Sequence, residues 1–398
     1  MERTTSSQPH ILYVGATLPA RSETFVYREV LGLRARGVRV SVASVHPPER
    51  DLKDPELDAL ASEAHVVYGC GPTGKLSTLL KGVRARPWGP TRGLLETRPG
   101  YWPKYVLQCR AGQALAHRLR DRGVTHVHAH MAHVPTTIAM HCAEALGVPF
   151  SFTGHAADLF RDRAALRTKL RRAAFVACIS EWHRSFYADL TGLPPSRLPI
   201  VRCGVDLDSF DPIAPVDGRS ILGVGRLVPK KGFDVAIRAL PQVEGAVLTL
   251  VGDGPEAPRL RALAEEVGVA ERVVFAGAQP NERVRQMLKE AALFVLPCRL
   301  AEDGDRDGIP VALMEAMARQ VCVVSGDLPT IRELVVDGVS GVMVPPGQVD
   351  PLVASLRRLL STPALRNRLA EGGRARVAQE FSLAVNLDRL QAAFAASG

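Results

Sequence analysis

Short apolar segments rich in β-branched residues alternate along the chain with longer segments of helical period. In the first half, helical patterns include residues 22–36, 106–121 and 135–146. The apolar segments, which we expect to be strands, fall at residues 11–16, 38–45, 64–69, 126–130, 150–155, 175–180 and 198–205. Near-continuous apolar strands separated by helices are typical of a parallel sheet that is covered on both faces.

The pattern breaks at a segment rich in Pro and Asp, residues 206–220, and then restarts. Further strands are expected at 221–227, 246–254, 272–278, 293–298, 321–327 and 339–346. Because a domain commonly has ~100–200 residues, a chain of 398 residues with one such break predicts two domains. We expect two Rossmann-like, doubly wound α/β domains that face each other across a cleft. Their predicted bounds are 1–208 and 217–380, with the amphipathic segment 383–398 packing back on the first domain.

The composition is that of a soluble globular protein, with 46% hydrophobic and 23% charged residues. No apolar run approaches the ~20 residues that span a bilayer. The polar start of the chain leads directly into a strand, so we expect no signal peptide. The seven cysteines are scattered, odd in number and without a C-x-x-C pair, which favours free thiols in a reducing cytoplasm over a metal or disulfide framework.

A net charge of +9 favours an anionic partner, either a phosphate-bearing substrate or the acidic face of a membrane. Aromatic residues make up only 5% of the chain and no nucleic-acid motif is recognisable, so the sequence predicts no nucleic-acid partner. We expect a cytoplasmic protein, and peripheral contact with the inner face of the cell membrane is compatible with its charge.

Candidate binding residues follow the expected strands, where open parallel sheets bind their ligands. The segment "GRLVPKKGFD" (225–234) begins with Gly225 and Arg226 at the end of a strand and continues through Lys231 into a helix. A guanidinium fork, a compact ammonium and helix-start amides together suit phosphate oxygens. A solvated basic turn is the alternative. Gly252 lies in a second glycine-rich turn, "VGDGPE" (251–256), which by itself indicates only close strand–helix packing.

A third segment, "DGIPVALMEAMARQ" (307–320), follows an acidic run and opens a helix. Gly308 permits close approach of a ligand to the backbone, and Pro310 suits the first helical turn, so amides in this turn could receive a diphosphate. Asp307 and Glu315 could accept hydrogen bonds from sugar hydroxyls. Glu315 lies on an otherwise apolar helix and therefore needs a partner, which could also be a buried arginine.

The segments "GRLVPKKGFD", "VGDGPE", "DGIPVALMEAMA" and "ELVVDGVSGVMVPP" (333–346) together resemble the donor-binding half of the retaining GT-B glycosyltransferases of family 4. The resemblance spans residues 221–346 and implies an activated sugar nucleotide in the interdomain cleft. Arg226 and Lys231 match the family's diphosphate-binding pair, and Glu315 matches its ribose-binding glutamate. Asp307 stands where the family usually has a glutamate that contacts hydroxyls of the donor sugar, and it is shorter by one methylene.

The first half has a narrower resemblance, to the bacterial exopolysaccharide subgroup of colanic-acid type. It rests on "SETFVYREV" (22–30), "HVHAHMAHVPTTIAMHCAEALGVPFSFTGHAADLF" (126–160) and "GDRDGIPVALMEAMA" (304–318). His155 and Asp158 match the subgroup's H-x-x-D element at the mouth of the active site, which implies that His155 lies against the donor sugar.

In this family the loop after the first strand approaches the diphosphate or the acceptor. Here that loop contains Gly15, Ser22 and Glu23. A purely structural explanation of Glu23 is equally open, since a carboxylate after an N-cap serine favours a helix start.

A group of histidines, His126, His128, His130 and His133, also suggests a metal site. Alternation along a strand would place three of them on one face, but no neighbouring helix offers a clear fourth ligand. We therefore expect no metal. His130 is expected to line the cleft, and the others to be structural or solvated.

The segment "GCGPTGKL" (69–76) nearly spells a phosphate-binding P-loop, but Leu76 replaces the hydroxyl residue that would hold Mg²⁺. We interpret it as the start of a variable loop, residues 75–104, in which Trp88 and Trp102 stand among cations. Such a loop suits an acceptor surface at a membrane interface, and a solvated insertion is an equal alternative.

The sequence thus predicts a retaining, metal-independent glycosyltransferase that moves a hexose-type sugar from a nucleoside diphosphate sugar to an acceptor hydroxyl. Exopolysaccharide or other cell-surface glycan biosynthesis, with a lipid-linked acceptor, is the leading pathway. The alternatives are glycosylation of a secondary metabolite, a nucleotide-sugar epimerase and a non-catalytic sugar-nucleotide sensor. The predicted catalytic residues are His155, Asp158, Arg226, Lys231 and Asp307. The donor is expected to contact Gly15, Gly225, Arg226, Lys231, Gly252, Gly308, Ile309, Pro310, Val311 and Glu315. The acceptor side is expected to include Ser22, Glu23 and His130.

Overall fold

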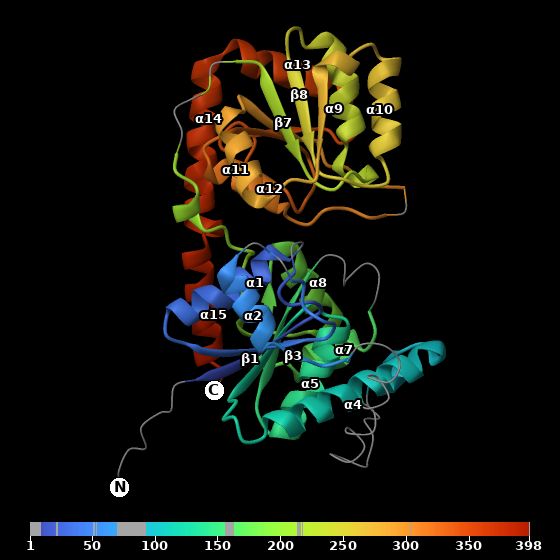
Figure 1. Cartoon of the computed structure of the whole chain (residues 1–398), viewed down its shortest axis with the longest axis vertical. Coiled ribbons are helices and arrows are strands. Elements are labelled where there is room, and N and C mark those ends of the chain that lie inside the picture. Colours follow the sequence, from blue (N-terminus) through green and yellow to red (C-terminus); the bar gives the residue numbers. More distant parts are fainter. Residues whose placement is uncertain are drawn as a thin grey trace. The chain divides into compact units, whose positions relative to one another are not determined.

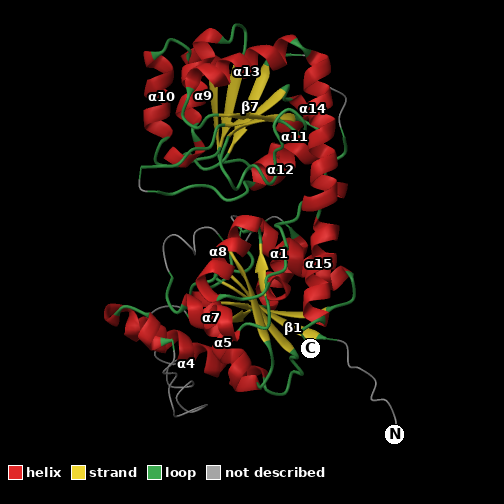
Figure 2. Ribbon diagram, turned by 180° about the vertical axis from the view of Figure 1, so that it is seen from behind, coloured by secondary structure: helices red, strands yellow, loops and turns green. Residues whose placement is uncertain are grey.

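The computed structural model describes residues 9–20, 23–50, 52, 54–69, 93–155, 163–212, 216, 218–302 and 304–397. The chain divides into two compact units, one made of residues 1–204 and 386–398 and the other of residues 205–385. Each unit contains a six-stranded parallel sheet with helices packed against it (Figures 1 and 2). The prediction of two doubly wound α/β sheets is therefore confirmed.

The sheet of the first unit has the strand order β3-β2-β1-β4-β5-β6, and all its pairs are parallel. Its strands are β1 (His10–Gly15), β2 (Arg39–Ser44), β3 (His65–Val66), β4 (His126–His130), β5 (Phe150–Gly154) and β6 (Val176–Cys178). Its helices are α1 (Thr24–Ala35), α2 (Pro55–Glu63), α4 (Trp102–Leu119), α5 (Val134–Leu146), α7 (Leu166–Arg172), α8 (Glu181–Thr191) and α15 (Leu383–Ala395), the last of which begins in the second unit.

The central strand β4 shows what each face of this sheet contains. Successive residues of a strand point to opposite faces, and Val127 and Ala129 join the main core together with side chains of α4 and α5. His126 and His128 lie on the other face, where their rings contact Phe394 of α15. The alternation expected from the sequence thus gives a strand with one aliphatic and one imidazole face.

The sheet of the second unit has the order β12-β11-β10-β7-β8-β9 and is also parallel. Its strands are β7 (Ser220–Val224), β8 (Val247–Val251), β9 (Val273–Gly277), β10 (Leu293–Leu296), β11 (Cys322–Gly326) and β12 (Val342–Val344). Its helices are α9 (Phe233–Ala239), α10 (Ala257–Glu266), α11 (Asn281–Glu290), α12 (Val311–Ala318), α13 (Val349–Ser361) and α14 (Pro363–Arg376). Helix α9 packs with α10 and α13, whereas α12 packs with α14.

One predicted strand, residues 198–205, is wrong. This segment makes only single bridges, from Ile200 to Cys178 and from Val205 to Ser382. Two local features stop the ladder from continuing: Pro199 has no amide hydrogen, and the amide of Arg202 donates to the side chain of Asn386. An apolar run of the right length is therefore an extended connection in the fold.

Residues 70–92 lie outside the described part of the chain, and they include most of the P-loop-like segment and of the predicted variable loop. In the described remainder of that loop, Trp102 begins α4 and its indole N–H donates to the carbonyl of Leu94. Among the described residues, no helix combines the length and the apolarity that crossing a membrane requires.

Candidate functional site

The loops that follow β7 and β8 are joined at the carboxyl edge of the second sheet. The amide of Gly225 donates to the carbonyl of Val251, and the amide of Leu227 donates to the carbonyl of Asp253, each at 2.9 Å. These bonds continue the β7–β8 ladder beyond the strands. The exposed Arg226 is therefore held between two anchored neighbours.

Two glycines allow the loops to approach this closely. Gly252 has φ +135°, and a Cβ on it would collide with the carbonyl of Gly225. Gly232 has φ +70°, and a Cβ there would collide with the carbonyl of Pro297, which follows β10. The glycines thus bring the turns after β7, β8 and β10 together. The packing role that the sequence suggested for Gly252 fits this geometry.

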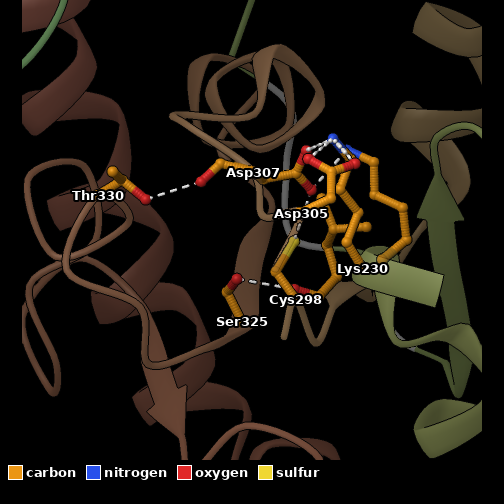
Figure 3. A network of polar contacts seen from close by, with 8 residues as sticks. Lys230, Cys298, Asp305, Asp307, Ser325 and Thr330 are labelled. Carbon is orange, nitrogen blue, oxygen red and sulfur yellow. Dashed lines mark hydrogen bonds and ion pairs between the residues drawn. The ribbon is translucent and has the colours of Figure 1, made fainter. Parts of the chain in front are cut away.

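A compact cluster of charges lies beside these turns (Figure 3). The ammonium of Lys231 is 2.9 Å from Asp307 Oδ2, and both side chains are largely buried, with 13% and 12% of their areas exposed. Lys231 also runs beside Gly225, because its Cε lies 3.3 Å from where a Cβ on that glycine would be. The structure therefore brings Asp307 to Gly225 and Lys231, which lie far from it in the sequence.

Cys298 completes this cluster, a role that no sequence motif predicted. Its thiol lies 3.2 Å from Asp307 Oδ2, and burial, with the nearby Asp307 charge, raises the pKa of Cys298 well above its usual range. The thiol is therefore protonated and donates to the carboxylate. Thr330 adds a hydrogen bond from its hydroxyl to the carbonyl of Asp307, at 2.9 Å. The only available clue was that Cys298 ends the apolar segment "LFVLPC".

The ion pair changes how readily Lys231 titrates. Burial alone would lower the pKa of Lys231, but its interaction with Asp307 outweighs burial and raises the pKa above the usual value. Lys231 is thus a fully charged ammonium at neutral pH, held at the carboxyl edge of the sheet. The neighbouring Lys230 pairs with Asp305 at 3.0 Å and lies 3.6 Å from Asp307.

Helix α12 begins next to this cluster. Pro310 is its N-cap residue and Val311 its first residue. The helix thus begins one residue after the proline, which we expected in the first helical turn. Gly308 and Ile309 form the bend between Asp307 and the helix. Amides in the first turn of a helix have no partner within the helix. Glu315 is half-buried in the second turn of α12, between the buried Met314 and Ala316.

The predicted residues of the first unit fall in a separate group. Gly15 ends β1, and Glu23 is the N-cap residue of α1 without a side-chain capping bond. His155 follows β5 and is 8% exposed. Its Nε2 is 3.2 Å from Nδ1 of His130, and its ring centroid is 4.7 Å from that of Phe25. Ser22 and Asp158 lie outside the described residues.

Burial dominates the electrostatics of this group. It holds the pKa of His155 well below the usual range, with a further contribution from His130. His128 is affected in the same way, and its ring nitrogens contact the hydroxyls of Ser151 and Thr153 at 2.7 and 3.0 Å. His126 and His128 are thus buried and hydrogen-bonded and not solvated.

The outlying His133 has a different, structural place. It is half-buried at the start of α5, and its Nδ1 accepts the amide hydrogen of Val134. It thus caps the helix with its own ring, which the sequence pattern of four histidines did not indicate.

A carboxylate that the sequence did not reveal lies beside these histidines. Glu29 of α1 brings an oxygen within 4.8 Å of ligand atoms on both His128 and His130. The sequence indicated no clear fourth ligand on a neighbouring helix, and Glu29 of α1 is a carboxylate that the sequence pattern did not reveal. The observed contacts do not suit a metal, however. Glu29 Oε1 and His130 Nε2 are 2.9 Å apart, which is a hydrogen bond, and both nitrogens of His128 are engaged by hydroxyls.

Two family models match the chain and together cover most of it. The model described as "Glycosyltransferase Family 4" matches residues 22–209, and the model described as "Glycosyl transferases group 1" matches residues 206–376. The boundary between the matches falls close to the boundary between the two units. The chain belongs to the GT-B glycosyltransferases of family 4, as its sequence motifs indicated.

Individual relatives match over shorter lengths. The amylovoran biosynthesis glycosyltransferase AmsK of Erwinia amylovora is 36% identical over 198 residues, which are 48% of this chain and 49% of AmsK. The GDP-mannose-dependent alpha-(1-6)-phosphatidylinositol monomannoside mannosyltransferase of Mycolicibacterium smegmatis is 36% identical over 228 residues, or 52% of this chain and 59% of that enzyme. The matches thus span about half the length of these relatives.

The fold has close counterparts among solved structures. Anabaena HepE in complex with UDP superposes with a TM-score of 0.75 over 97% of this chain and 99% of that one, at 16% identity. At this identity the likeness concerns the fold alone. It covers both units, so the whole chain has the GT-B architecture.

Proposed function

We propose that the chain is a retaining glycosyltransferase that moves a hexose-type sugar from a nucleoside diphosphate sugar to an acceptor hydroxyl. The observation that carries the proposal is the Lys231–Asp307 pair at the carboxyl edge of the second sheet. There a fixed cation, the neighbouring Arg226 and the first amides of α12 can meet a diphosphate, while a carboxylate next to them can accept sugar hydroxyls. Membership of the family supports these roles.

The proposed chemistry uses these groups as the diphosphate leaves. Departure of the leaving group builds negative charge on its oxygens, which Arg226, Lys231 and the amides of Gly308, Ile309 and Val311 would stabilise without a metal. The sugar acquires oxocarbenium character, as in glycoside hydrolysis. The acceptor hydroxyl then attacks the anomeric carbon from the face that the diphosphate leaves and transfers its proton to the departing phosphate. The configuration at the anomeric carbon is therefore retained.

The remaining predicted residues have narrower roles in the proposal. Glu315 would accept hydrogen bonds from the ribose hydroxyls, and Asp307 those of the donor sugar. Gly15 and Gly252 let the backbone approach the donor closely. In the first unit, His155 and Asp158 would meet the donor sugar, and Ser22, Glu23 and His130 would line the acceptor side.

The class of donor and acceptor is inferred from the relatives. One relative is named as GDP-mannose-dependent and HepE was solved with UDP, so GDP-mannose and UDP-glucose are suitable first probes. AmsK acts in amylovoran biosynthesis, and the mycobacterial relative glycosylates a phosphatidylinositol monomannoside. We therefore propose a cell-surface glycan or lipid-linked acceptor. The charge of +9 fits peripheral binding to an acidic membrane face from the cytoplasm.

The first test is to measure binding and product formation separately. The melting temperature is measured with GDP-mannose, UDP-glucose or a dTDP-sugar. It should rise with the matching donor, since a ligand that binds only the native state stabilises that state. Products are then analysed with donor alone and with donor plus acceptor. An epimerase would isomerise the donor without acceptor, whereas a sensor would bind it without turnover. Either result would refute the transferase.

A further inference from the structure

A chain of buried polar contacts links α1 to His155 in the first unit. The hydroxyl of Tyr13 donates to Glu29 Oε1 at 2.7 Å, and the same oxygen is 2.9 Å from Nε2 of His130. Nδ1 of His130 is in turn 3.2 Å from Nε2 of His155. Tyr13, Glu29, His130 and His155 are exposed by 0%, 9%, 2% and 8%, so water competes little for these bonds.

The first two contacts determine the hydrogen on His130. Burial, together with Glu29, raises the pKa of Tyr13 well above its usual range, so its hydroxyl stays protonated and donates. Glu29 Oε1 accepts from Tyr13 on one side and therefore accepts from the His130 ring on the other. Nε2 of His130 thus carries the hydrogen.

The third contact, between Nδ1 of His130 and Nε2 of His155, makes the position of the hydrogen on His155 depend on that of His130. Both imidazoles pack against aromatic rings: the ring centroids of Tyr13 and His130 are 5.9 Å apart, and Phe25 lies against His155. A neutral imidazole has one N–H and one acceptor nitrogen. If Nε2 of His130 holds its hydrogen, its Nδ1 must accept, and the facing Nε2 of His155 must donate.

We propose that Tyr13 and Glu29 are positioning residues for His155. Acting through His130, the Glu29 carboxylate holds His155 as the tautomer with hydrogen on Nε2 and leaves Nδ1 as the hydrogen-bond acceptor. On the proposed glycosyl transfer, Glu29 and His130 thereby orient the His155 ring that would contact the donor sugar. The inference of a substrate contact rests on the proposed function, whereas the assignment of the tautomer does not.

The tautomer can be measured without any substrate. Long-range ¹H–¹⁵N spectra of protein labelled at histidine, at pH 8, distinguish the two tautomers, and the His155→Ala variant identifies the signal. The expected result is His155 with hydrogen on Nε2. Observing hydrogen on Nδ1 of His155 in the wild-type protein would overturn the proposal. This measurement needs no variant of Glu29.

A matched pair of variants tests the control by Glu29. The Glu29→Leu variant has no acceptor for the hydrogen of His130 Nε2, so the hydrogen of His155 is no longer held on Nε2 and should move in part to Nδ1. Glu144→Leu is the control, because Glu144 also pairs with a buried histidine, His141, at 3.3 Å, but lies outside this chain of contacts. The His155 signal should change in the first variant alone. An unchanged signal in Glu29→Leu would contradict the proposal.

Kinetics separate positioning from general stability. Release of nucleoside diphosphate from GDP-mannose or UDP-glucose should fall about 10- to 100-fold in Glu29→Leu, the range found for partners that orient metal-bound histidines. In a His155→Ala background the same change should have little further effect. Equal losses in both backgrounds would refute the positioning role. If the wild-type protein turns over no donor, the proposed function fails, while the spectra still decide the tautomer.

Discussion

Replacing Lys231 with alanine is the most informative single perturbation of the proposed donor site. The change removes the ammonium that lies 2.9 Å from Asp307 and beside Gly225, but it leaves the turns of the loop intact, because their bonds are between backbone groups. We expect turnover to fall by about 10²- to 10³-fold, which is the loss typical of removing one group that stabilises charge in a transition state.

The effect on stability should be smaller than the effect on rate. With an effective dielectric constant near 20, two unit charges at the observed separation attract each other by about 6 kcal/mol. Desolvation offsets most of this attraction. Breaking a fully buried pair costs about 3–5 kcal/mol. Asp307 keeps the Cys298 thiol at 3.2 Å, Lys230 at 3.6 Å and some exposure to water. We therefore expect a loss of about 1–3 kcal/mol, and the fold should survive.

The assay compares Lys231→Ala with Lys230→Ala. Lys230 has the same charge at the next position, but it is more exposed and pairs mainly with Asp305, so its loss should lower turnover by less than about tenfold. Nucleoside diphosphate release and urea unfolding are measured on both variants. Near-normal turnover in Lys231→Ala, or an equal loss in both variants, would refute the assignment of Lys231 to the diphosphate.

Three further predictions concern the structure that holds the site. Gly252→Ala should destabilise the protein by more than about 3 kcal/mol in urea unfolding, since its Cβ meets the Gly225 carbonyl. Gly277→Ala, at a position with positive φ but free space, should cost only about 1–2 kcal/mol. Because the pKa of Lys231 is raised in the folded protein, the Lys231–Asp307 pair stabilises the fold fully at neutral pH and loses this contribution as pH rises above about 10.4, the ordinary lysine value. The free energy of unfolding, measured in urea from pH 8 to 11, should therefore decline more steeply for the wild-type protein than for Asp307→Asn. Parallel declines would contradict the coupling. Phe394→Ala should lower stability by about 1–3 kcal/mol, because the half-buried ring contacts His126 and His128; a change below about 0.5 kcal/mol would mean that α15 contributes little to the first unit.

The sequence predicted the two sheets because both rest on local signals. Apolar strands such as 293–298 and 321–327 repeat with helices between them, and that alternation alone indicates a parallel sheet. The motif residues Arg226, Lys231 and Asp307 were found because they follow strands, where ligands of open sheets bind. Their convergence was inferred from the family resemblance, and for Lys231 and Asp307 the structure gives a direct contact.

The contributions of Cys298 and Glu29 could not be predicted because they depend on long-range packing. Cys298 resembles any buried thiol at the end of a strand until the loop before α12 brings Asp307 against it. Glu29 sits on α1, about a hundred residues from His130, and no pattern in either segment links them. The extended run 198–205 was misread for a similar reason, since a side chain from residue 386 takes its backbone amide.

The most direct test of the proposed donor site is a crystal structure of the protein with UDP or GDP bound. We predict diphosphate oxygens within about 3.2 Å of the Lys231 ammonium and of the first amides of α12, with Arg226 turned towards them. A nucleotide bound elsewhere, with the Lys231–Asp307 pair undisturbed and no phosphate near α12, would contradict it.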